Sequence, residues 1–374
     1  MIPINKPWLD DDTKQEVLNV LAENSLTSPA KNGGKRVQDF ESLLKSYLSV
    51  KHVIAVNSGT SAIHASLLSL GIGPGDEVIL PSFTFVATAN SVVATGAKPV
   101  FADINIDDYT IDVDDVEKKI TDKTKAIIPV HLYGHTSNLN KLNAIAKANS
   151  INIVEDACQS LGSLYNEKQT GTIGNLGCFS FYASKVLTTG EGGAIVTDDD
   201  DIYEELLMIR NHGMVNGYDT RVFGLNLRLP ELCAAIGISQ MRKLNQMLEI
   251  RKTNAELLSE GLRGFEHKGI LKLPKEPENG KFNWYLFTVG FKENSHRELI
   301  KNSLLKAGIG ATVYYDPPVH KTPYYDNKNK SSDSSADLLP NTTWAWTHVL
   351  SLPVHPLMTT NDLNTIVKTF ENTL

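Results

Sequence analysis

The sequence predicts an α/β protein in which a large domain with a mostly parallel sheet precedes a small α+β domain at the C-terminus. Three observations favour this fold class. A chain of 374 residues exceeds what one hydrophobic core usually serves, so a second domain is expected. From residue 52 onward, short β-rich runs alternate with helical patterns, as in parallel sheets covered by helices on both faces. A long helical pattern then separates this region from a shorter set of mixed elements.

The elements of the large domain are expected where apolar residues follow the period of a strand or a helix. Strands are predicted at 52–56, 77–80, 98–102, 126–130 and 151–155, and helices at 60–70, 84–94 and 139–148. Ligands of such sheets bind at the carboxyl ends of the strands. The residues that follow these runs are therefore the first candidates for a site.

The second half of the chain begins with a long helix. Apolar residues recur with helical spacing through 229–262, and this helix is expected to connect the two domains. A strand-like run at 284–291 and helical runs at 296–307 and 362–370 indicate the small domain. We therefore place the large domain, with its N-terminal arm, at 1–250 and the small domain at 251–374. The polar stretch 327–335 lacks periodicity and predicts a mobile surface loop.

The composition argues against several classes of protein. The net charge is -7 and no dense run of lysine or arginine occurs, which disfavours a nucleic-acid-binding surface. The first residues lack the apolar core of a signal peptide, and no apolar run is long enough to span a bilayer. A cytoplasmic protein without membrane contact is expected. Cys158, Cys178 and Cys233 are widely spaced and odd in number, so we expect small buried hydrophobic residues and no metal site.

One interpretation of the segment 57–62 is a phosphate site. It lies between a predicted strand and a predicted helix, where unpaired amide hydrogens and the helix dipole favour an anion. Gly59 lets the backbone approach closely, and Ser58 and Thr60 add hydroxyl donors. The alternative is an ordinary helix N-cap, because serine and threonine are common there.

Two carboxylates, Glu155 and Asp156, end an apolar run. A buried acid needs a partner to remain ionised. The protonated pyridine nitrogen of a cofactor would be such a partner for Asp156, and it would let the ring accept electrons from a neighbouring carbanion. The alternative is a carboxylate that caps the next helix.

Lys185 follows 29 positions later, among aromatic, small and hydroxyl residues. Such surroundings remove water from the amine and make it a usable nucleophile toward an aldehyde. The alternative is a solvated surface lysine. Glycines at 190, 192 and 193 would leave room for a cofactor beside it.

A phosphate cradle, an acid at a strand end and a lysine near a glycine-rich turn are more specific in this order than any one alone. With its neighbouring motifs, the chain resembles the DegT/DnrJ/EryC1/StrS sugar aminotransferases. These are enzymes of fold type I that depend on pyridoxal 5'-phosphate (PLP) and make amino sugars on nucleotide carriers. The resemblance covers nearly the whole chain, and the matching stretches are 58–62, 74–78, 81–88, 130–134, 155–160, 179–193, 210–213, 224–229 and 352–353.

The resemblance implies the fold of PLP-dependent transferases of type I, with a mostly parallel seven-stranded sheet in the large domain. It implies that Lys185 holds the cofactor covalently and that Asp156 pairs with the ring nitrogen. Phe85 is implied to stack on the ring and Gln159 to contact the ring hydroxyl.

The same resemblance implies a homodimer with shared active sites. Asn226 corresponds to the asparagine that reaches the phosphate from the neighbouring subunit. Leu225 departs from the family, which often has an aromatic residue there, and this weakens the match at Asn226. The remaining implied contacts are Ser58, Gly59, Thr60 and Ser180 on the phosphate side, and Arg228, His320 and Lys321 toward the substrate.

The implied reaction is transamination. An amino acid, L-glutamate in this interpretation, would convert PLP to pyridoxamine 5'-phosphate, and a nucleotide-linked keto sugar would then take the amino group for polysaccharide or glycan biosynthesis. The stretch 188–193 looks more like relatives that aminate carbon 4 of a hexose, which indicates a 4-keto-6-deoxyhexose.

Four alternatives stay open to different degrees. A 3-aminotransferase of the same family fits nearly as well. A sugar dehydratase of the family carries histidine at the lysine position, so Lys185 disfavours it. A non-catalytic PLP-binding regulator usually carries a DNA-binding segment, for which this chain is expected to have no room. A dinucleotide-binding dehydrogenase is disfavoured because the glycines of 171–177 are wrongly spaced and no strand is predicted just before them.

Overall fold

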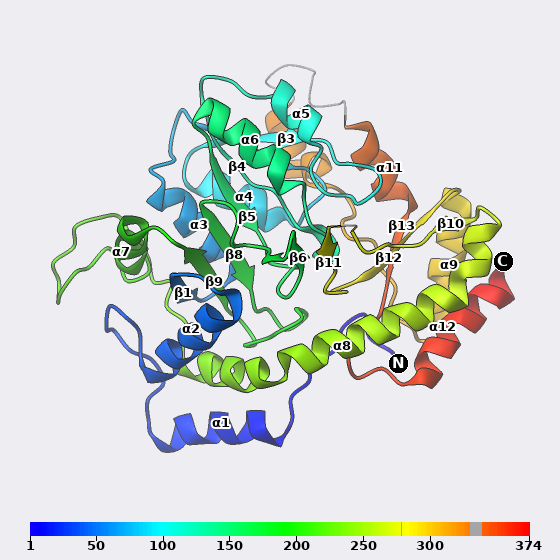
Figure 1. Cartoon of the computed structure of the whole chain (residues 1–374), viewed down its shortest axis with the longest axis horizontal. Helices are drawn as coiled ribbons and strands as arrows, with labels where there is room; N and C mark the ends of the chain where they lie inside the picture. The colour runs from blue at the N-terminus through cyan, green and yellow to red at the C-terminus, as the bar shows by residue number, and fades with distance from the viewer. Residues whose placement is uncertain (278, 330–338) are drawn as a thin grey trace.

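The computed structural model describes residues 1–277, 279–329 and 339–374. Its central feature is a seven-stranded sheet in the order β1-β9-β8-β5-β4-β2-β3 (Figure 1). The pairs β3-β2, β2-β4, β4-β5 and β5-β8 are parallel, whereas β9 is antiparallel to both of its neighbours, β8 and β1. The α/β fold with a mostly parallel seven-stranded sheet is therefore confirmed.

The elements follow the predicted alternation closely in the first half of the chain. The strands of the main sheet are β1 (His52–Val56), β2 (Glu77–Pro81), β3 (Lys98–Ala102), β4 (Thr124–Ile127), β5 (Asn152–Asp156), β8 (Leu176–Ser180) and β9 (Gly193–Thr197). The helices up to β9 and just after it are α1 (Asp11–Ala22), α2 (Lys35–Leu48), α3 (Gly59–Ser69), α4 (Val86–Ala94), α5 (Val113–Lys118), α6 (Leu139–Asn149) and α7 (Asp200–Ile209), with a short 3-10 turn η1 (Leu132–Gly134).

Helices cover both faces of the main sheet because successive side chains of each strand point to opposite sides. In β1, Ile54 and Val56 join the apolar core beneath α3 and α7, whereas Val53 and Ala55 join the core beneath α2 and α8. A third cluster lies under α5 and α6. The strands are buried on both faces, as parallel sheets require.

The long helix α8 (Glu231–His267) runs along the molecule from the side of the main sheet to the C-terminal elements (Figure 1). There it packs on α12 (Thr360–Thr373) beside a second sheet in the order β10-β12-β13. The remaining elements are β6 (Leu164–Tyr165), β7 (Lys168–Gln169), β10 (Leu271–Lys272), β11 (Gly280–Lys281), β12 (Phe287–Phe291), α9 (Asn294–Lys306), η2 (Val319–Lys321), α10 (Pro323–Asn329), α11 (Pro340–His348) and β13 (Val349–Leu352). The predicted domain boundary at residue 250 falls inside α8 and stays a prediction.

The first residues of the chain lie against C-terminal elements. Ile2 pairs with Ile309 in a parallel bridge, and the amide of Gly310 donates to the Ile2 carbonyl at 2.7 Å. The N-terminal arm therefore contacts the region that follows α9, although it was grouped with the large domain by sequence.

The predicted surface loop and the three cysteines can be compared with the structure only within the described residues. Of the predicted loop 327–335, residues 327–329 end α10, and the rest lies outside the described residues. Cys178 is buried and Cys158 and Cys233 are partly buried, and all three are free thiols. Within the described ranges, no helix is both long and apolar enough to cross a membrane, and no cluster of potential metal ligands occurs.

Candidate active site

A cavity of about 570 Å³ lies where the carboxyl ends of β1, β2, β5 and β8 meet. Eight of the predicted site residues line it: Ser58, Gly59, Thr60, Phe85, Asp156, Gln159, Ser180 and Lys185. These residues come from four separate stretches of sequence, and the parallel order of the sheet brings them to one edge. This is the position in which open α/β sheets bind ligands.

One wall of the cavity is the N-terminus of α3. Ser58 caps the helix and its hydroxyl accepts from the Ser61 amide at 3.0 Å, which leaves the amides of the first turn directed outward. A Cβ at Gly59 would lie 2.8 Å from Cys158 Sγ and 2.8 Å from Ser180 Cβ. Only glycine fits there, and the resulting hollow at a helix N-terminus suits a phosphate group.

Asp156 forms the opposite wall, at the end of β5, and is only 5% exposed. Its carboxylate accepts from the Thr88 hydroxyl at 2.8 Å and from the Cys158 amide at 3.2 Å. Within the described ranges, no cationic side chain forms an ion pair with it. A buried carboxylate without a cation suits a positively charged ligand group such as a protonated pyridine nitrogen.

Lys185 stands on the loop between the antiparallel strands β8 and β9. The loop is closed at its base by the Phe181 amide, which donates to Gly192, and by the Thr189 amide, which donates to Phe181. Phe181 is fully buried and anchors the loop in the core. Lys185 therefore lines the cavity from a loop that is held in place, together with Asp156 and the start of α3.

Gln159 and the aromatic residues close the remaining side. The side-chain oxygen of Gln159 accepts from the Tyr133 amide at 2.8 Å, and its nitrogen donates to the Tyr315 hydroxyl at 3.2 Å. Phe85 is 55% exposed, and its ring centroid lies 5.9 Å from that of Tyr315. An exposed aromatic face at a cavity wall can stack on a planar ring.

The donor set fits PLP. A nucleophilic amine, a buried acid that lacks a cation, a helix N-terminus cleared by Gly59 and an open aromatic face converge on one cavity. Each would suit a different part of the cofactor: the aldehyde, the ring nitrogen, the phosphate and the ring face.

Two predicted residues lie outside this cavity. Asn226 is exposed, and its backbone pairs with Asn211 while its carbonyl accepts from Asn57 at 3.2 Å. Arg228 donates to Asn211 at 2.6 Å and bridges to Val56 through its backbone. Their segment lies next to the cradle without pointing a side chain into it.

His320 and Lys321 also lie apart, on the short turn η2. His320 is 3% exposed, and its Nδ1 is 2.5 Å from the Ser82 hydroxyl. This contact ties η2 to the residue that follows β2. A role of either residue in substrate binding stays a prediction.

The sequence interpretation missed the residues that the second half of the chain adds to the cavity. Tyr285, Tyr314 and Tyr315 line it together with Tyr182 and Thr88. The adjacent tyrosines at 314 and 315 were the available signal, but aromatic residues near prolines are equally common in cores. Thr88 lies in the matching stretch 81–88, but its contact with Asp156 joins α4 to β5 and was not predicted.

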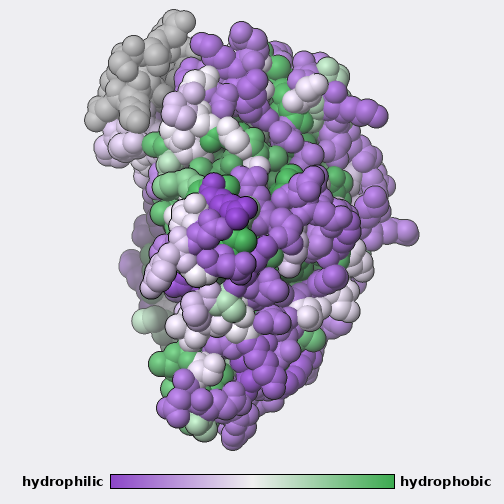
Figure 2. Space-filling model, turned by 90° about the vertical axis from the view of Figure 1, so that its left-hand side faces the viewer, coloured by the Kyte–Doolittle hydropathy of each residue, from purple (hydrophilic) through white to green (hydrophobic). Residues whose placement is uncertain are grey.

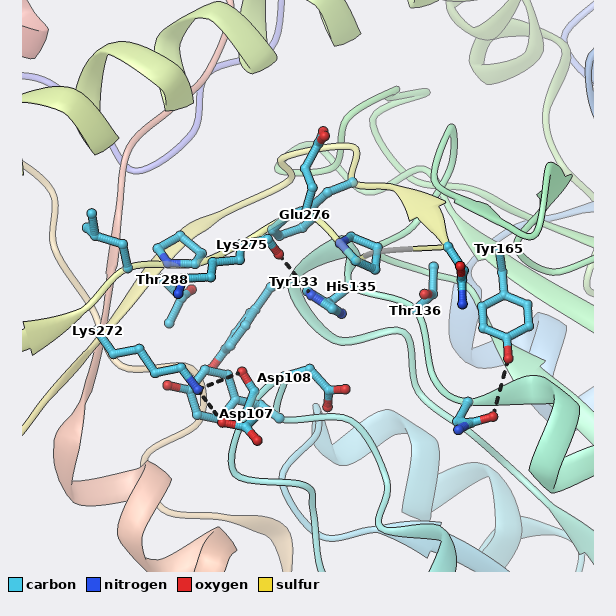
Figure 3. A pocket seen from close by; sticks show the side chains of 17 residues that line it. Asp107, Asp108, Tyr133, His135, Thr136, Tyr165, Lys272, Lys275, Glu276 and Thr288 are labelled. Carbon is cyan, nitrogen blue, oxygen red and sulfur yellow. Dashed lines mark hydrogen bonds and ion pairs between the residues drawn. The ribbon is translucent and has the colours of Figure 1, made fainter. Parts of the chain in front are cut away.

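A second cavity of about 630 Å³ lies on the other side of Tyr133 (Figure 3). At one end Lys272 pairs with Asp107 at 2.5 Å, and at the other the Tyr165 hydroxyl donates to Asn138 at 3.2 Å. Between them the His135 ring contacts the Lys275 carbonyl at 3.1 Å. None of the predicted site residues lines it. Tyr133 connects the two cavities, because its amide holds Gln159 and its hydroxyl donates to the Tyr314 carbonyl.

Comparisons with known proteins agree with this geometry. The model of the DegT/DnrJ/EryC1/StrS aminotransferase family matches residues 8–371. A GDP-perosamine synthase of Caulobacter vibrioides is 32% identical over 100% of this chain and 98% of its own length. A dTDP-3-amino-3,4,6-trideoxy-alpha-D-glucose transaminase of Streptomyces venezuelae is 36% identical over 94% of this chain and 91% of its own.

Solved structures share the whole architecture. Spr1654 from Streptococcus pneumoniae, solved in its PLP form, has a TM-score of 0.90 and 27% identity over 100% of this chain and 98% of that chain. The same protein has also been solved in the form that carries pyridoxamine 5'-phosphate (PMP). The chain studied here belongs to the DegT/DnrJ/EryC1/StrS aminotransferase family and is a PLP-dependent sugar aminotransferase.

Proposed function

We propose that this enzyme, whose family acts on nucleotide sugars, transfers the amino group of L-glutamate to a nucleotide-linked 4-keto-6-deoxyhexose. The observation that supports transamination is the convergence of the Lys185 amine, the Asp156 carboxylate and the α3 N-terminus on one cavity. The product would be an amino sugar for polysaccharide or glycan biosynthesis.

Each residue has a separate task in this proposal. PLP, when bound, supplies an electron sink for the carbanion that forms next to the transferred nitrogen. Asp156 holds a proton on the pyridine nitrogen. Gly59, Thr60 and Ser180 bind the phosphate, with Ser58 as the helix cap. Lys185, once its amine is free, moves the proton between the two carbons of the shift.

Phe85 and Gln159 orient the cofactor in this proposal. Phe85 would cover one face of the ring, and Gln159, fixed by Tyr133 and Tyr315, would contact the ring hydroxyl. Because both sides of the Gln159 amide are already engaged within the protein, its orientation is set before the cofactor enters.

The position of the new amine rests on the stretch 188–193, which resembles enzymes acting at carbon 4. The Streptomyces venezuelae relative carries a name that places its amine at carbon 3, and a 3-aminotransferase of Acidithiobacillus ferrooxidans is 34% identical over 91% of this chain. Amination at carbon 3 is therefore the second candidate.

We further propose that the active site is shared in a homodimer. Asn226 is exposed and lies outside the cavity of its own chain, and the same segment exposes Phe223 (67%) and Tyr218 (98%). The side of the molecule that carries α7 shows apolar residues between polar ones (Figure 2). Such a surface supports an isologous contact in which each copy places Asn226, and with it Arg228, near the other copy's phosphate.

The test of the function is a panel of nucleotide-linked keto sugars incubated with the PMP form of the enzyme. Product mass and the position of the amine are the measurements. We expect conversion of a 4-keto-6-deoxyhexose to a 4-amino sugar, and conversion of a 3-keto sugar alone would favour the second candidate. A product that has lost a hydroxyl and gained no nitrogen would identify a dehydratase and overturn the proposal.

A further inference from the structure

The Lys185 amine lies over the ring face of Tyr285, a residue that has no role in the proposed function. Its Nζ is 4.9 Å from the centroid of the Tyr285 ring, and the hydroxyls of Ser184 and Tyr285 are 3.5 Å apart. An ammonium group at this distance from a ring face is attracted by the ring quadrupole. Tyr285 is 6% exposed, so the contact is largely shielded from water.

A buried arginine holds the backbone at Tyr285. Arg251, in α8, is 1% exposed and donates to the carbonyls of Trp284 at 3.4 Å and Tyr285 at 3.3 Å. Within the described ranges no carboxylate pairs with it, and burial lowers the pKa of Arg251 to about 10. A charge buried this way is tolerated because neutral oxygens surround it.

Asn5 of the N-terminal arm contacts both Arg251, which holds Tyr285, and the loop that carries Lys185. Its side-chain oxygen accepts from Arg251 at 3.1 Å, and its nitrogen donates to the carbonyl of Ser184, the neighbour of Lys185. The contacts therefore form a closed cycle that runs from Lys185 through Ser184, Asn5, Arg251 and Tyr285 back to Lys185. The cycle joins four segments that are separate in the sequence.

We propose that Tyr285 is a positioning residue for the free amine of Lys185 and that Asn5 and Arg251 fix its place. This rests on the proposed role of Lys185 in moving the proton. In that role the amine leaves the cofactor, becomes an ammonium when it takes the proton, and must remain within reach of both carbons. The Tyr285 face holds that ammonium in place, and the cycle prevents the face and the lysine loop from separating.

The test compares variants that remove one contact of this cycle with matched variants that keep it. Tyr285→Leu removes the ring, whereas Tyr285→Phe keeps it. Asn5→Asp keeps an acceptor for Arg251 but removes the donor to Ser184, so the contact with Arg251 can remain while the link to the lysine loop is lost. Lys6→Ala is the matched control in the arm, because Lys6 is exposed next to Asn5.

Two measurements are made on each variant. The first is acylation of Lys185 by an amine-selective anhydride in the cofactor-free protein, quantified by peptide mass spectrometry. The second is the kcat and KM of transamination. For Tyr285→Leu and Asn5→Asp we expect acylation about tenfold faster and kcat about tenfold lower at unchanged KM, the size of a desolvated cation–π contact. Tyr285→Phe and Lys6→Ala should stay within about twofold of wild type.

The outcomes separate this inference from the proposed function. If Tyr285→Leu acylates and turns over like wild type, the positioning role is wrong. A rise in KM with unchanged kcat would show a structural effect on substrate binding instead, and would overturn it equally. If the Lys185→Ala variant transaminates like wild type, the proposed role of Lys185 is wrong, and the inference is overturned with it.

Discussion

Asp156 occupies the cavity with its carboxylate held by Thr88 and by the Cys158 amide, so its orientation does not depend on the ligand. We expect Asp156→Ala to bind PLP but to lower turnover by at least about a hundredfold, because the ring nitrogen loses the partner that keeps it protonated. Steady-state kinetics with glutamate would measure this. Thr88→Ser, which keeps the hydroxyl, is the control and should retain most activity. Near-normal turnover of Asp156→Ala would show that another acid has this role.

In the proposed function, Lys185 is the residue that would hold the cofactor covalently. Lys185→Ala should abolish the absorbance of the lysine-bound cofactor and all transamination, while circular dichroism stays unchanged because the loop is anchored by Phe181 rather than by the lysine. Lys168→Ala, at an exposed position of β7, is the matched control. Borohydride-reducible labelling that persists in Lys185→Ala would contradict the assignment.

Glu155 is fully buried one position before Asp156 and serves the fold. Its carboxylate accepts from His131 at 2.9 Å and from the amides of Gly171, Ile173 and Gly174 at 2.6 to 2.7 Å. Burial alone would raise the pKa of Glu155, but the hydrogen bonds outweigh burial and the pKa lies below its usual value.

Because the folded-state pKa of Glu155 is lowered, its contribution to stability is present above the unfolded-state pKa of about 4.3 and is lost as the pH falls through the folded value. Glu155→Gln should lower the free energy of unfolding by about 2–4 kcal/mol at neutral pH, since an amide would face amide donors. Urea denaturation at several pH values would measure the difference, which should shrink below about pH 4. A difference independent of pH would mean that the carboxylate charge is not involved.

Among single residues, the sequence identified those whose charged side chains stand in apolar surroundings. Asp156 at a strand end and Lys185 among small and aromatic residues both line the cavity. Tyr285 was not predicted as a site residue because its role depends on contacts with Arg251 in α8 and Asn5 near the N-terminus. Contacts between distant segments leave no spacing in the sequence.

At the scale of elements, the start of α3 is the most constrained part of the site. Gly59→Ala would place a Cβ 2.8 Å from Cys158 Sγ and from Ser180 Cβ, so β8 and α3 must separate. We expect the affinity for PLP to fall about tenfold or more, measured by titrating the cofactor-free protein. Gly264→Ala in α8 is the matched control, because nothing lies within 4 Å of its Cβ. Equal affinities in both variants would show that the cradle adapts.

The elements that sequence predicted best are those with strong apolar periodicity. β1, β3 and α6 begin at the predicted residues, and α8 begins two residues later than predicted and ends five residues later. Helices α1 and α2 were not predicted, since their mean character is polar. Helix α1 packs on α8, and α2 packs on α8 and β1. The reversed direction of β9 could not be read from the sequence, because the twelve residues 181–192 that join β8 to β9 are too long for a tight hairpin turn and carry no local turn signature.

At the scale of the molecule, the shared-site proposal has a test by complementation. Asn226→Asp would place a carboxylate near the partner's phosphate site and should weaken PLP binding through like-charge repulsion. Mixed with Lys185→Ala protein, it should form heterodimers in which one site carries both lesions and the other carries none. Activity should therefore reappear on mixing, up to about half of the wild-type value per heterodimer. No recovery despite heterodimers detected by native mass spectrometry would mean that Asn226 serves its own chain.

The continuous helix α8 has a mechanical consequence. Its 37 residues form a continuous helix about 55 Å long that packs against α1 and α2 at one end and against α12 at the other. A hinge near residue 250 would have to break its hydrogen-bond ladder and expose Leu248 and Arg251. Because α8 is continuous, a rigid-body movement of the elements at its two ends toward each other would be costly. Substrates should therefore enter through movement of side chains and loops at the mouth of the cavity. The same continuity couples the two ends in unfolding, and calorimetry should show one transition rather than two.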